Sequence, residues 1–181
     1  SQNELERIES LIQNLLKITK IDSKTIILNK ASVNVKKLIT KILYSFETRA
    51  EKEGKSISIR GLENTNLFCD YEWISEALSN LIKNALDNTK ENDKIMIEWV
   101  ETPITTIISV SDTGNGIHIE DIHHIFKRFY RSKFSKSNQG LGLGLPLVKS
   151  IIEQHNGTIT VESNFLQGST FTLSFLKLTN M

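Results

Sequence analysis

Three short motifs rich in asparagine or glycine follow one another along the chain. They are the segments 79–89 (SNLIKNALDNT), 112–117 (DTGNGI) and 140–145 (GLGLGL). The first lies within a helical apolar pattern, the second ends a strand pattern, and the third precedes a helix. A fold that brings these three places together would form a nucleotide pocket with a glycine-hinged lid, and this is what the order of the motifs predicts.

Helical and strand patterns alternate along the chain. Helices are expected over 4–22, from Ser32 or Asn34 to about 53, over 70–88, around 119–126 and over 141–155. Strands are expected at 25–28, 55–60, 66–69, 95–100, 105–110, 158–162 and 169–176. The patterns therefore predict a two-layer α/β sandwich, with a mixed, largely antiparallel sheet covered on one face by helices.

Composition narrows the class of protein. The 181 residues, 39% of them hydrophobic, suit one globular domain with an appended element. A net charge of +1 gives no reason to expect a nucleic-acid partner. The single cysteine, Cys69, suits a reducing compartment, and no apolar run approaches the roughly 20 residues of a membrane span. We therefore expect this part of the protein to be cytoplasmic.

The first helix, 4–22, carries a wide apolar stripe that includes Leu5, Ile8, Ile12 and Leu15. Their three- and four-residue spacing favours packing on another helix in a bundle. The alternative is a terminal helix that docks on its own domain.

The first motif places two amides on one helix face. Asn80 and Asn84 are four residues apart, so both project from the same side. An amide oxygen is a suitable hard ligand for Mg²⁺, which binds through a few protein oxygens together with phosphates. Ordinary capping or surface asparagines are the alternative.

The second and third motifs suit the two ends of a nucleotide. Asp112 ends a strand, and an ionised carboxylate can accept a hydrogen bond from an exocyclic amine such as that of adenine. An ordinary Asp-Gly turn is the alternative. The glycines of 140–145 open a helix, whose amino terminus can hold phosphates. Between them, 125–131 (IFKRFYR) combines aromatic residues with cations that could pin a mobile segment and reach phosphates.

In this order the segments resemble the catalytic ATP-binding domain of sensor histidine kinases, which has the Bergerat fold of gyrase, Hsp90 and mismatch-repair ATPases. The three motifs resemble its N box and two glycine boxes, and 125–131 resembles its F box. Residues 168–171 (GSTF) resemble its last glycine-box strand. The resemblance divides the chain into 1–22, the second helix of a dimerisation and phosphoacceptor hairpin, and 23–181, the catalytic domain with a lid at about 113–140.

The resemblance implies ATP and Mg²⁺ as ligands. Asn84 would bind Mg²⁺, and Asn80 would support it or the phosphates. Asp112 would accept from the adenine amine, and Arg131 would contact phosphates. The other residues implied to contact ATP are Gly114, Gly116, Ile117, Phe126, Phe129, Gly140, Leu141, Gly142, Leu143, Gly144, Leu145 and Thr170, with Lys83, Lys127 and Arg128 as further candidate phosphate contacts.

The resemblance also implies a reaction and partners. The γ-phosphoryl group of Mg-ATP would pass to a histidine on the hairpin, and from there to an aspartate of a response regulator. The full-length protein would be a homodimeric sensor of the cytoplasmic membrane. The four histidines of this chain lie within or after the lid, so the acceptor is expected outside the chain, and this piece alone should not autophosphorylate. They are His118, His123, His124 and His155.

Several positions depart from the family pattern. Asp87 and Asn88 stand where many members have lysine and then tyrosine or histidine, and Lys127 replaces an acid or glutamine. Asn80 stands where the hydrolysing members have a water-activating glutamate, and an amide cannot accept a proton as a carboxylate can. Transfer is therefore favoured over hydrolysis. The alternatives are a degenerate, non-catalytic nucleotide-binding or interaction module and an anti-sigma-type serine kinase of the same fold.

Overall fold

A five-stranded mixed sheet forms one layer of the protein. The computed structural model describes residues 1–134 and 142–177. In this sheet only β2 and β4 run parallel, and the other neighbouring pairs are antiparallel. The strands lie in the order β2 (Ser56–Arg60), β4 (Lys94–Glu101), β5 (Thr105–Asp112), β7 (Gly168–Leu176) and β6 (Thr158–Asn164).

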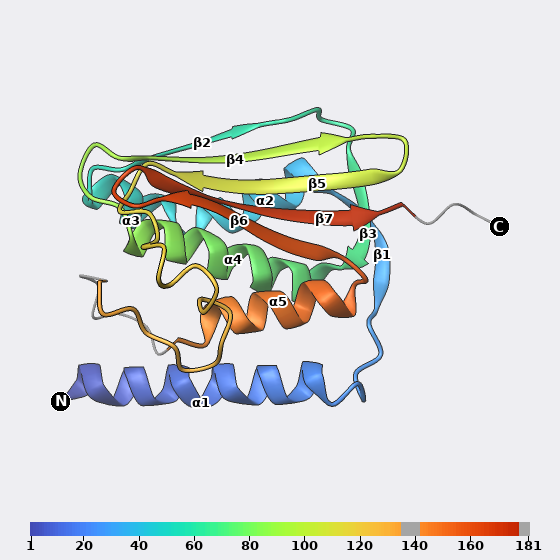
Figure 1. Cartoon of the computed structure of the whole chain (residues 1–181). Coiled ribbons are helices and arrows are strands. Elements are labelled where there is room, and N and C mark those ends of the chain that lie inside the picture. Colours follow the sequence, from blue (N-terminus) through green and yellow to red (C-terminus); the bar gives the residue numbers. More distant parts are fainter. Residues whose placement is uncertain (135–141, 178–181) are drawn as a thin grey trace.

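The helices cover one face of this sheet (Figure 1). A separate antiparallel pair, β1 (Lys30–Asn34) and β3 (Asn66–Asp70), closes one end of the helical layer. This arrangement confirms the predicted two-layer sandwich. The helices are α1 (Gln2–Asp22), α2 (Val35–Tyr44), α3 (Glu47–Lys52), α4 (Tyr71–Asp87) and α5 (Gly144–Gln154).

The core lies between α4 and the inner face of the sheet. Alternate residues of β4 and β5, such as Ile97 and Ile108, are fully buried, as are Leu78, Leu81 and Ile82 of α4. Each such side chain contributes about 1.5–3 kcal/mol when it leaves water. This burial fixes the rotation of α4, and with it the direction in which the polar side of the helix faces.

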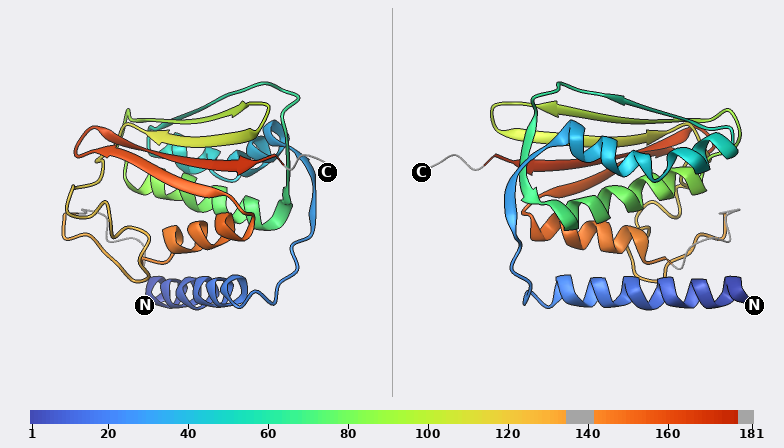
Figure 2. Two further views of the ribbon diagram at one scale, coloured as in Figure 1. Left: turned by 45° about the vertical axis from the view of Figure 1, so that its right-hand side comes forward. Right: turned by 180° about the vertical axis from the view of Figure 1, so that it is seen from behind.

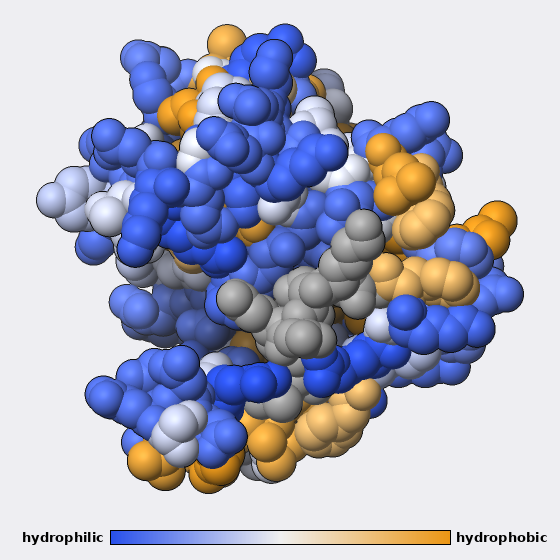
Figure 3. Space-filling view, turned by 90° about the vertical axis from the view of Figure 1, so that its left-hand side faces the viewer, coloured by the Kyte–Doolittle hydropathy of each residue, from blue (hydrophilic) through white to orange (hydrophobic). Residues whose placement is uncertain are grey.

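Helix α1 lies outside the sandwich, alongside α5, in both views of Figure 2. Its last turns dock on the domain through Ile18 and Ile21, which are buried. Leu5, Ile8 and Ile12 are 63%, 52% and 51% exposed. Figure 3 shows hydrophobic side chains along the lower edge of the molecule, where α1 lies. The last turns of α1 therefore dock on its own domain and its apolar stripe stays exposed, so the packing of this stripe in a helix bundle stays a prediction.

Several element boundaries were predicted correctly because a side chain marks them. Asn34 begins α2, since its Oδ1 accepts a hydrogen bond from the Lys37 backbone N–H at 3.0 Å. Asp70 begins α4 in the same way, accepting from Trp73 N–H at 3.1 Å. Gly54, expected to end the helix before β2, adopts a φ of 66° beyond α3. Within the described ranges 1–134 and 142–177, no helix has both the length and the hydropathy of a membrane span.

Three local predictions were wrong. The helix expected up to about 53 is two helices, because the chain turns at Ser45, whose N–H and hydroxyl both bond to Ile42 O. The strand expected at 25–28 is an extended connection without strand pairing, and β1 begins only at Lys30, opposite β3. The helix expected around 119–126 is a series of turns, since its backbone bonds span three residues and do not form a continuous ladder.

Candidate functional site

A cavity of about 1000 Å³ lies between α4, the end of β5, the start of α5 and α1. It collects residues from all three sequence motifs and from the segment 125–131. Gly140 and Leu141, which were also predicted to bind ATP, lie outside the described residues. The predicted residues that line the cavity are Asn80, Lys83, Asn84, Asp112, Gly116, Ile117, Arg131, Gly142, Leu143, Gly144 and Leu145.

The two amides of the first motif face this cavity because the opposite side of α4 is in the core. Asn80 donates through Nδ2 to the backbone oxygen of Glu76 at 2.9 Å. Asn84 receives two contacts from Asn88 Nδ2, at 2.7 Å to its backbone oxygen and 3.3 Å to its Oδ1. The amide oxygens of Asn80 and Asn84 are the hard donor type that Mg²⁺ binds, so these residues fit the ion.

Asp112 lies at the end of β5 and is 8% exposed. Its Oδ1 accepts a hydrogen bond from Gly114 N–H at 2.9 Å. Burial raises the pKa of the Asp112 carboxyl to about 6, and the nearby charge of Asp93 adds to the rise, although backbone hydrogen bonds from Gly114 and Ser169 oppose it. A buried acceptor with few partners is suited to an amine of a bound base.

The glycines after Asp112 leave room for protein backbone. A Cβ on Gly114 would lie 2.0 Å from the backbone oxygen of Asn88. Gly116 has a φ of 65°, and its Cβ would lie 2.1 Å from the oxygen of Asn164. Any side chain here would push the cavity wall away from α4 or from the β6–β7 turn, so these glycines hold the wall in place.

The amino terminus of α5 points its first turn at the cavity. Leu143, Gly144, Leu145 and Pro146 line the cavity, and within the described residues no side chain caps this end of the helix. Because no described side chain caps the helix, the backbone N–H groups of Gly144 and Leu145 are available as donors to an anion, whereas Pro146 has no N–H. This geometry suits phosphate groups.

A family model described as "Histidine kinase-, DNA gyrase B-, and HSP90-like ATPase" matches residues 69–180. The chain belongs to this family. The sensor protein SrrB of Staphylococcus aureus (strain NCTC 8325 / PS 47) is 31% identical over 177 residues, which cover 97% of this chain and 30% of SrrB. The chain therefore spans less than a third of this curated relative.

Two solved histidine kinases have the same fold. AdeS of Acinetobacter baumannii is 26% identical with a TM-score of 0.80, over 97% of this chain and 81% of AdeS. ThkA, solved in complex with the response regulator protein TrrA, is 28% identical with a TM-score of 0.80, over 98% of this chain and 49% of that chain. Together with the SrrB match, they identify the chain as the ATP-binding catalytic domain of a sensor histidine kinase.

The F-box segment of this kinase domain only partly follows the prediction. Phe126 packs edge-on against Phe171 with ring centroids 6.4 Å apart, as an anchor should. Phe129 is 56% exposed and so does not anchor the lid through its side chain; its backbone N–H instead donates to Gly142 O at 3.0 Å. Gly142 itself has a φ of 72° and leaves no room for a Cβ against Tyr130 O, 2.5 Å away. The F-box segment therefore contacts the backbone at Gly142, just before α5.

The cationic side chains predicted to contact phosphates differ in whether they line the cavity or pair with other side chains. Arg131 lines the cavity. Lys127 bonds to His124 Nδ1 at 2.7 Å, and Arg128 pairs with Asp22 at the end of α1, so both are engaged elsewhere. Lys83 lines the cavity and lies 3.5 Å from Asp87 Oδ2.

Thr170 takes a neighbouring position. Its hydroxyl is 2.9 Å from that of Ser111, and it lines a smaller cavity of about 220 Å³ that also includes Asp112. Thr170 is not among the residues that line the main cavity.

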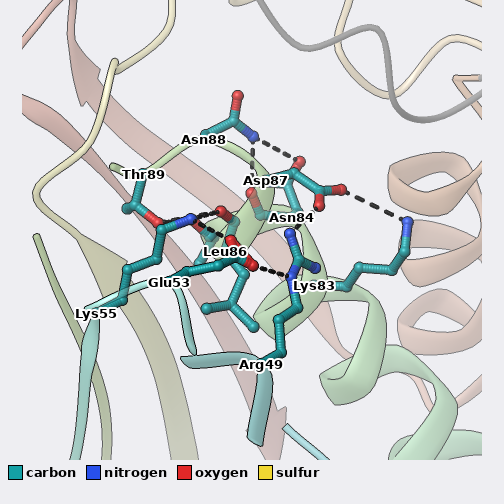
Figure 4. A network of polar contacts seen from close by, with 10 residues as sticks. Arg49, Glu53, Lys55, Lys83, Asn84, Leu86, Asp87, Asn88 and Thr89 are labelled. Atoms are coloured by element: carbon teal, nitrogen blue, oxygen red, sulfur yellow. Dashed lines mark hydrogen bonds and ion pairs between the residues drawn. The ribbon is translucent and has the colours of Figure 1, made fainter. Parts of the chain in front are cut away.

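Asp87, the residue that departs from the family pattern, carries a partner of its own (Figure 4). Arg49 reaches from α3 and bonds Asp87 Oδ1 at 2.7 Å and Glu53 Oε2 at 2.7 Å. Burial opposes ionisation of Glu53, but hydrogen bonds from Arg49 and Lys55 outweigh it and hold the pKa of that carboxyl below its ordinary value. The negative charge at position 87 is therefore compensated within the protein.

Asp121 and a stripe on α1 are among the lining residues that were missed from the sequence. Asp121, 3% exposed, accepts from Tyr130 Oη at 2.5 Å and from Ser132 Oγ, and so ties down the F-box segment. Its sequence context carried no signal, because an acid in a polar loop is usually exposed. The stripe on α1, which has three- and four-residue spacing opposite the apolar stripe, could have been noticed. Its members are Asn3, Glu6, Arg7, Ser10 and Asn14.

Proposed function

We propose that this domain binds Mg-ATP in the cavity and donates the γ-phosphoryl group to a histidine on a helix that pairs with α1. The observation that carries the proposal is the convergence of Asn80 and Asn84, Asp112 and the uncapped start of α5 on one cavity. Asp112 would accept from the adenine amine, and the α5 amino terminus and Arg131 would hold phosphates.

Mg²⁺ would neutralise phosphate charge when bound, and Asn84 would hold it with Asn80 in support. The chain's own role in transfer is then positioning, because phosphoryl transfer needs little further chemistry from the protein. The amides fix the phosphates against α4, and the lid end at Gly142 closes the other side.

Two acids of the cavity, Asp121 and Asp87, support transfer rather than hydrolysis. Asp121 is bound by Tyr130 and Ser132, and Asp87 is bound by Arg49, so neither is poised to activate water. Asp112 belongs to the proposed base end of the cavity. Asn80 holds the place of a general base without being able to accept a proton.

The whole-protein roles belong to the same proposal. α1 would be the second helix of a dimerisation hairpin, in residues 1–22, with its exposed apolar stripe facing the bundle. A response regulator would receive the phosphoryl group, a role supported by the likeness to ThkA, which is solved in complex with one. The full-length protein would be a phosphorylated, membrane-bound homodimer, with this domain in the cytoplasm.

Calorimetric titration with Mg-ATP and a phosphotransfer assay test the proposal. The chain should bind Mg-ATP, release phosphate slowly, and phosphorylate a separately supplied acceptor hairpin. It should not label itself, and acid-labile phosphohistidine on this chain alone would contradict that part. Tight ATP binding without any transfer would instead favour a non-catalytic binder, the alternative that Asp87 and Asn88 raised.

A further inference from the structure

A short chain of polar contacts runs from α1 to the cavity. Lys17 Nζ on α1 lies 3.1 Å from Glu76 Oε1 on α4. The same Glu76 Oε1 accepts a hydrogen bond from Asn80 Nδ2 at 3.3 Å, and the Glu76 backbone oxygen accepts from that nitrogen at 2.9 Å. Glu76 therefore contacts Asn80 directly, and Lys17 is linked to Asn80 through Glu76.

These contacts fix which end of the Asn80 amide faces the cavity. A side-chain amide has a donor end and an acceptor end of nearly the same shape, so its neighbours decide its orientation. Here both acceptors on Glu76 take the NH₂ end. The oxygen end is turned toward the start of α5, because a Cβ placed on Gly144 would lie 3.1 Å from Asn80 Oδ1.

The orientation matters for a cation site. Mg²⁺ accepts oxygen ligands, directly or through its waters, whereas an NH₂ group in the same place would repel it. If the Glu76 carboxylate turned away, one of the two bonds that hold the amide would be lost. Lys17 keeps the carboxylate in place, because an ammonium and a carboxylate at this distance attract each other.

We propose that Lys17 and Glu76 are a positioning pair for Asn80, through which the docking of α1 sets the affinity of the site for Mg-ATP. The inference rests on the proposed function, since it assumes that Asn80 supports Mg²⁺ or the phosphates. α1 is close enough to act in this way: Ile18, next to Lys17, is fully buried, and Asn14, one turn earlier, lines the cavity.

Two single variants test the pair, with Lys20→Met as a matched control on an exposed position of the same helix. Lys17→Met and Glu76→Ala should each raise the Mg²⁺ concentration that half-saturates ATP binding by about three- to tenfold, the effect of one hydrogen bond or ion pair. The affinity for adenosine, which has no phosphates, should stay within about twofold of the unmodified chain. Lys17→Arg keeps the positive charge, so its half-saturating Mg²⁺ concentration should equal that of the unmodified chain.

A charge-reversed double variant, Lys17→Glu with Glu76→Lys, separates positioning from simple docking. Lys17→Met removes an ion pair between the helices and should lower the thermal unfolding midpoint. The double variant restores an ion pair, so this midpoint should recover. The new ammonium at position 76 can only donate, so it would attract the oxygen of Asn80 and turn its NH₂ end toward the cavity. The half-saturating Mg²⁺ concentration should therefore stay as high as in the single variants.

The outcomes are distinguishable. Failure of the unmodified chain to bind Mg-ATP would refute the proposed function itself. Normal binding there, with unchanged Mg²⁺ dependence in Lys17→Met and Glu76→Ala, would overturn the positioning pair alone. Recovery of Mg²⁺ dependence together with the thermal midpoint in the double variant would also overturn it, since the pair would then act only as a docking contact.

Discussion

Replacing Asp112 by asparagine should weaken nucleotide binding and yet stabilise the empty domain. Burial raises the pKa of this carboxyl from 3.8 to about 6. The folded chain therefore holds the Asp112 proton more tightly than the unfolded chain does. The stability this group contributes is complete below about pH 3.8 and is lost as the pH rises through about 6.

The pKa shift of Asp112 corresponds to a loss of unfolding free energy. About two pKa units correspond to ~3 kcal/mol, lost in full at neutral pH. Asparagine removes this cost, but its single oxygen can replace only one of the acceptors that Gly114 and Ser169 use, which costs about 1–2 kcal/mol. The net gain in unfolding free energy should be about 1–2 kcal/mol near pH 7.5, and it should shrink toward zero near pH 4.5.

Urea unfolding followed by tryptophan fluorescence measures this difference at both pH values, since Trp99 is buried in the core. Glu51→Gln, which removes the same charge from an exposed site, is the control and should change stability by less than about 0.5 kcal/mol at either pH. The reasoning would be refuted by an Asp112→Asn protein whose stability relative to the unmodified chain does not depend on pH. Weaker Mg-ATP binding by the more stable variant would show that the loss is not due to unfolding.

Three further changes have defined outcomes. Arg49→Met leaves Asp87 with only the longer contact to Lys83, 3.5 Å away, and should lower the unfolding free energy by about 2 kcal/mol in urea titration. Gly116→Ala should cost at least about 2 kcal/mol and abolish measurable ATP binding, because its Cβ would overlap Asn164 O. Burial lowers the pKa of the His155 imidazole, so its contribution to stability is present above about pH 6.5 and lost as the pH falls; His155→Gln should flatten this acid slope.

Each of these has a matched comparison. Arg60→Met, at a side chain 74% exposed, should be nearly neutral where Arg49→Met is not. Gly144→Ala meets only the amide of Asn80 and should fold normally, so equal destabilisation in both glycine variants would contradict the role given to Gly116. If the unfolding free energy of His155→Gln still falls with pH as steeply as that of the unmodified chain, groups other than His155 cause the acid destabilisation.

The sequence predicted the parts of the site that local spacing determines. Asn80 and Asn84 share a face on any straight helix, and Asp112 follows a strand that alternates cleanly. It could not predict contacts that depend on how elements dock. Glu76 contacts Lys17 only because Ile18 buries the end of α1 against the domain, and no spacing within α4 encodes that.

The errors have the same physical origin. Residues 25–28 have the β-branched composition of a strand, yet a strand needs a partner, and β3 pairs instead with Lys30–Asn34. The polar segment around Asp121 was expected to start a helix, but its carboxylate is held by Tyr130 and Ser132 from farther along the chain. Both outcomes follow from tertiary contacts that outweigh local propensity.

The features that build the cavity each weaken the empty fold, which ties the stability of this domain to its ligand. Asp112 is kept ionised in a buried place at a cost of ~3 kcal/mol, and α5 begins without a side-chain cap among the described residues. A ligand at about 100 times its Kd stabilises the folded state by about 2.7 kcal/mol. The net gain of about 1–2 kcal/mol expected for Asp112→Asn is smaller than this, so the ATP-bound native chain should unfold at a somewhat higher urea concentration than the empty variant, and Mg-ATP should shift the variant much less.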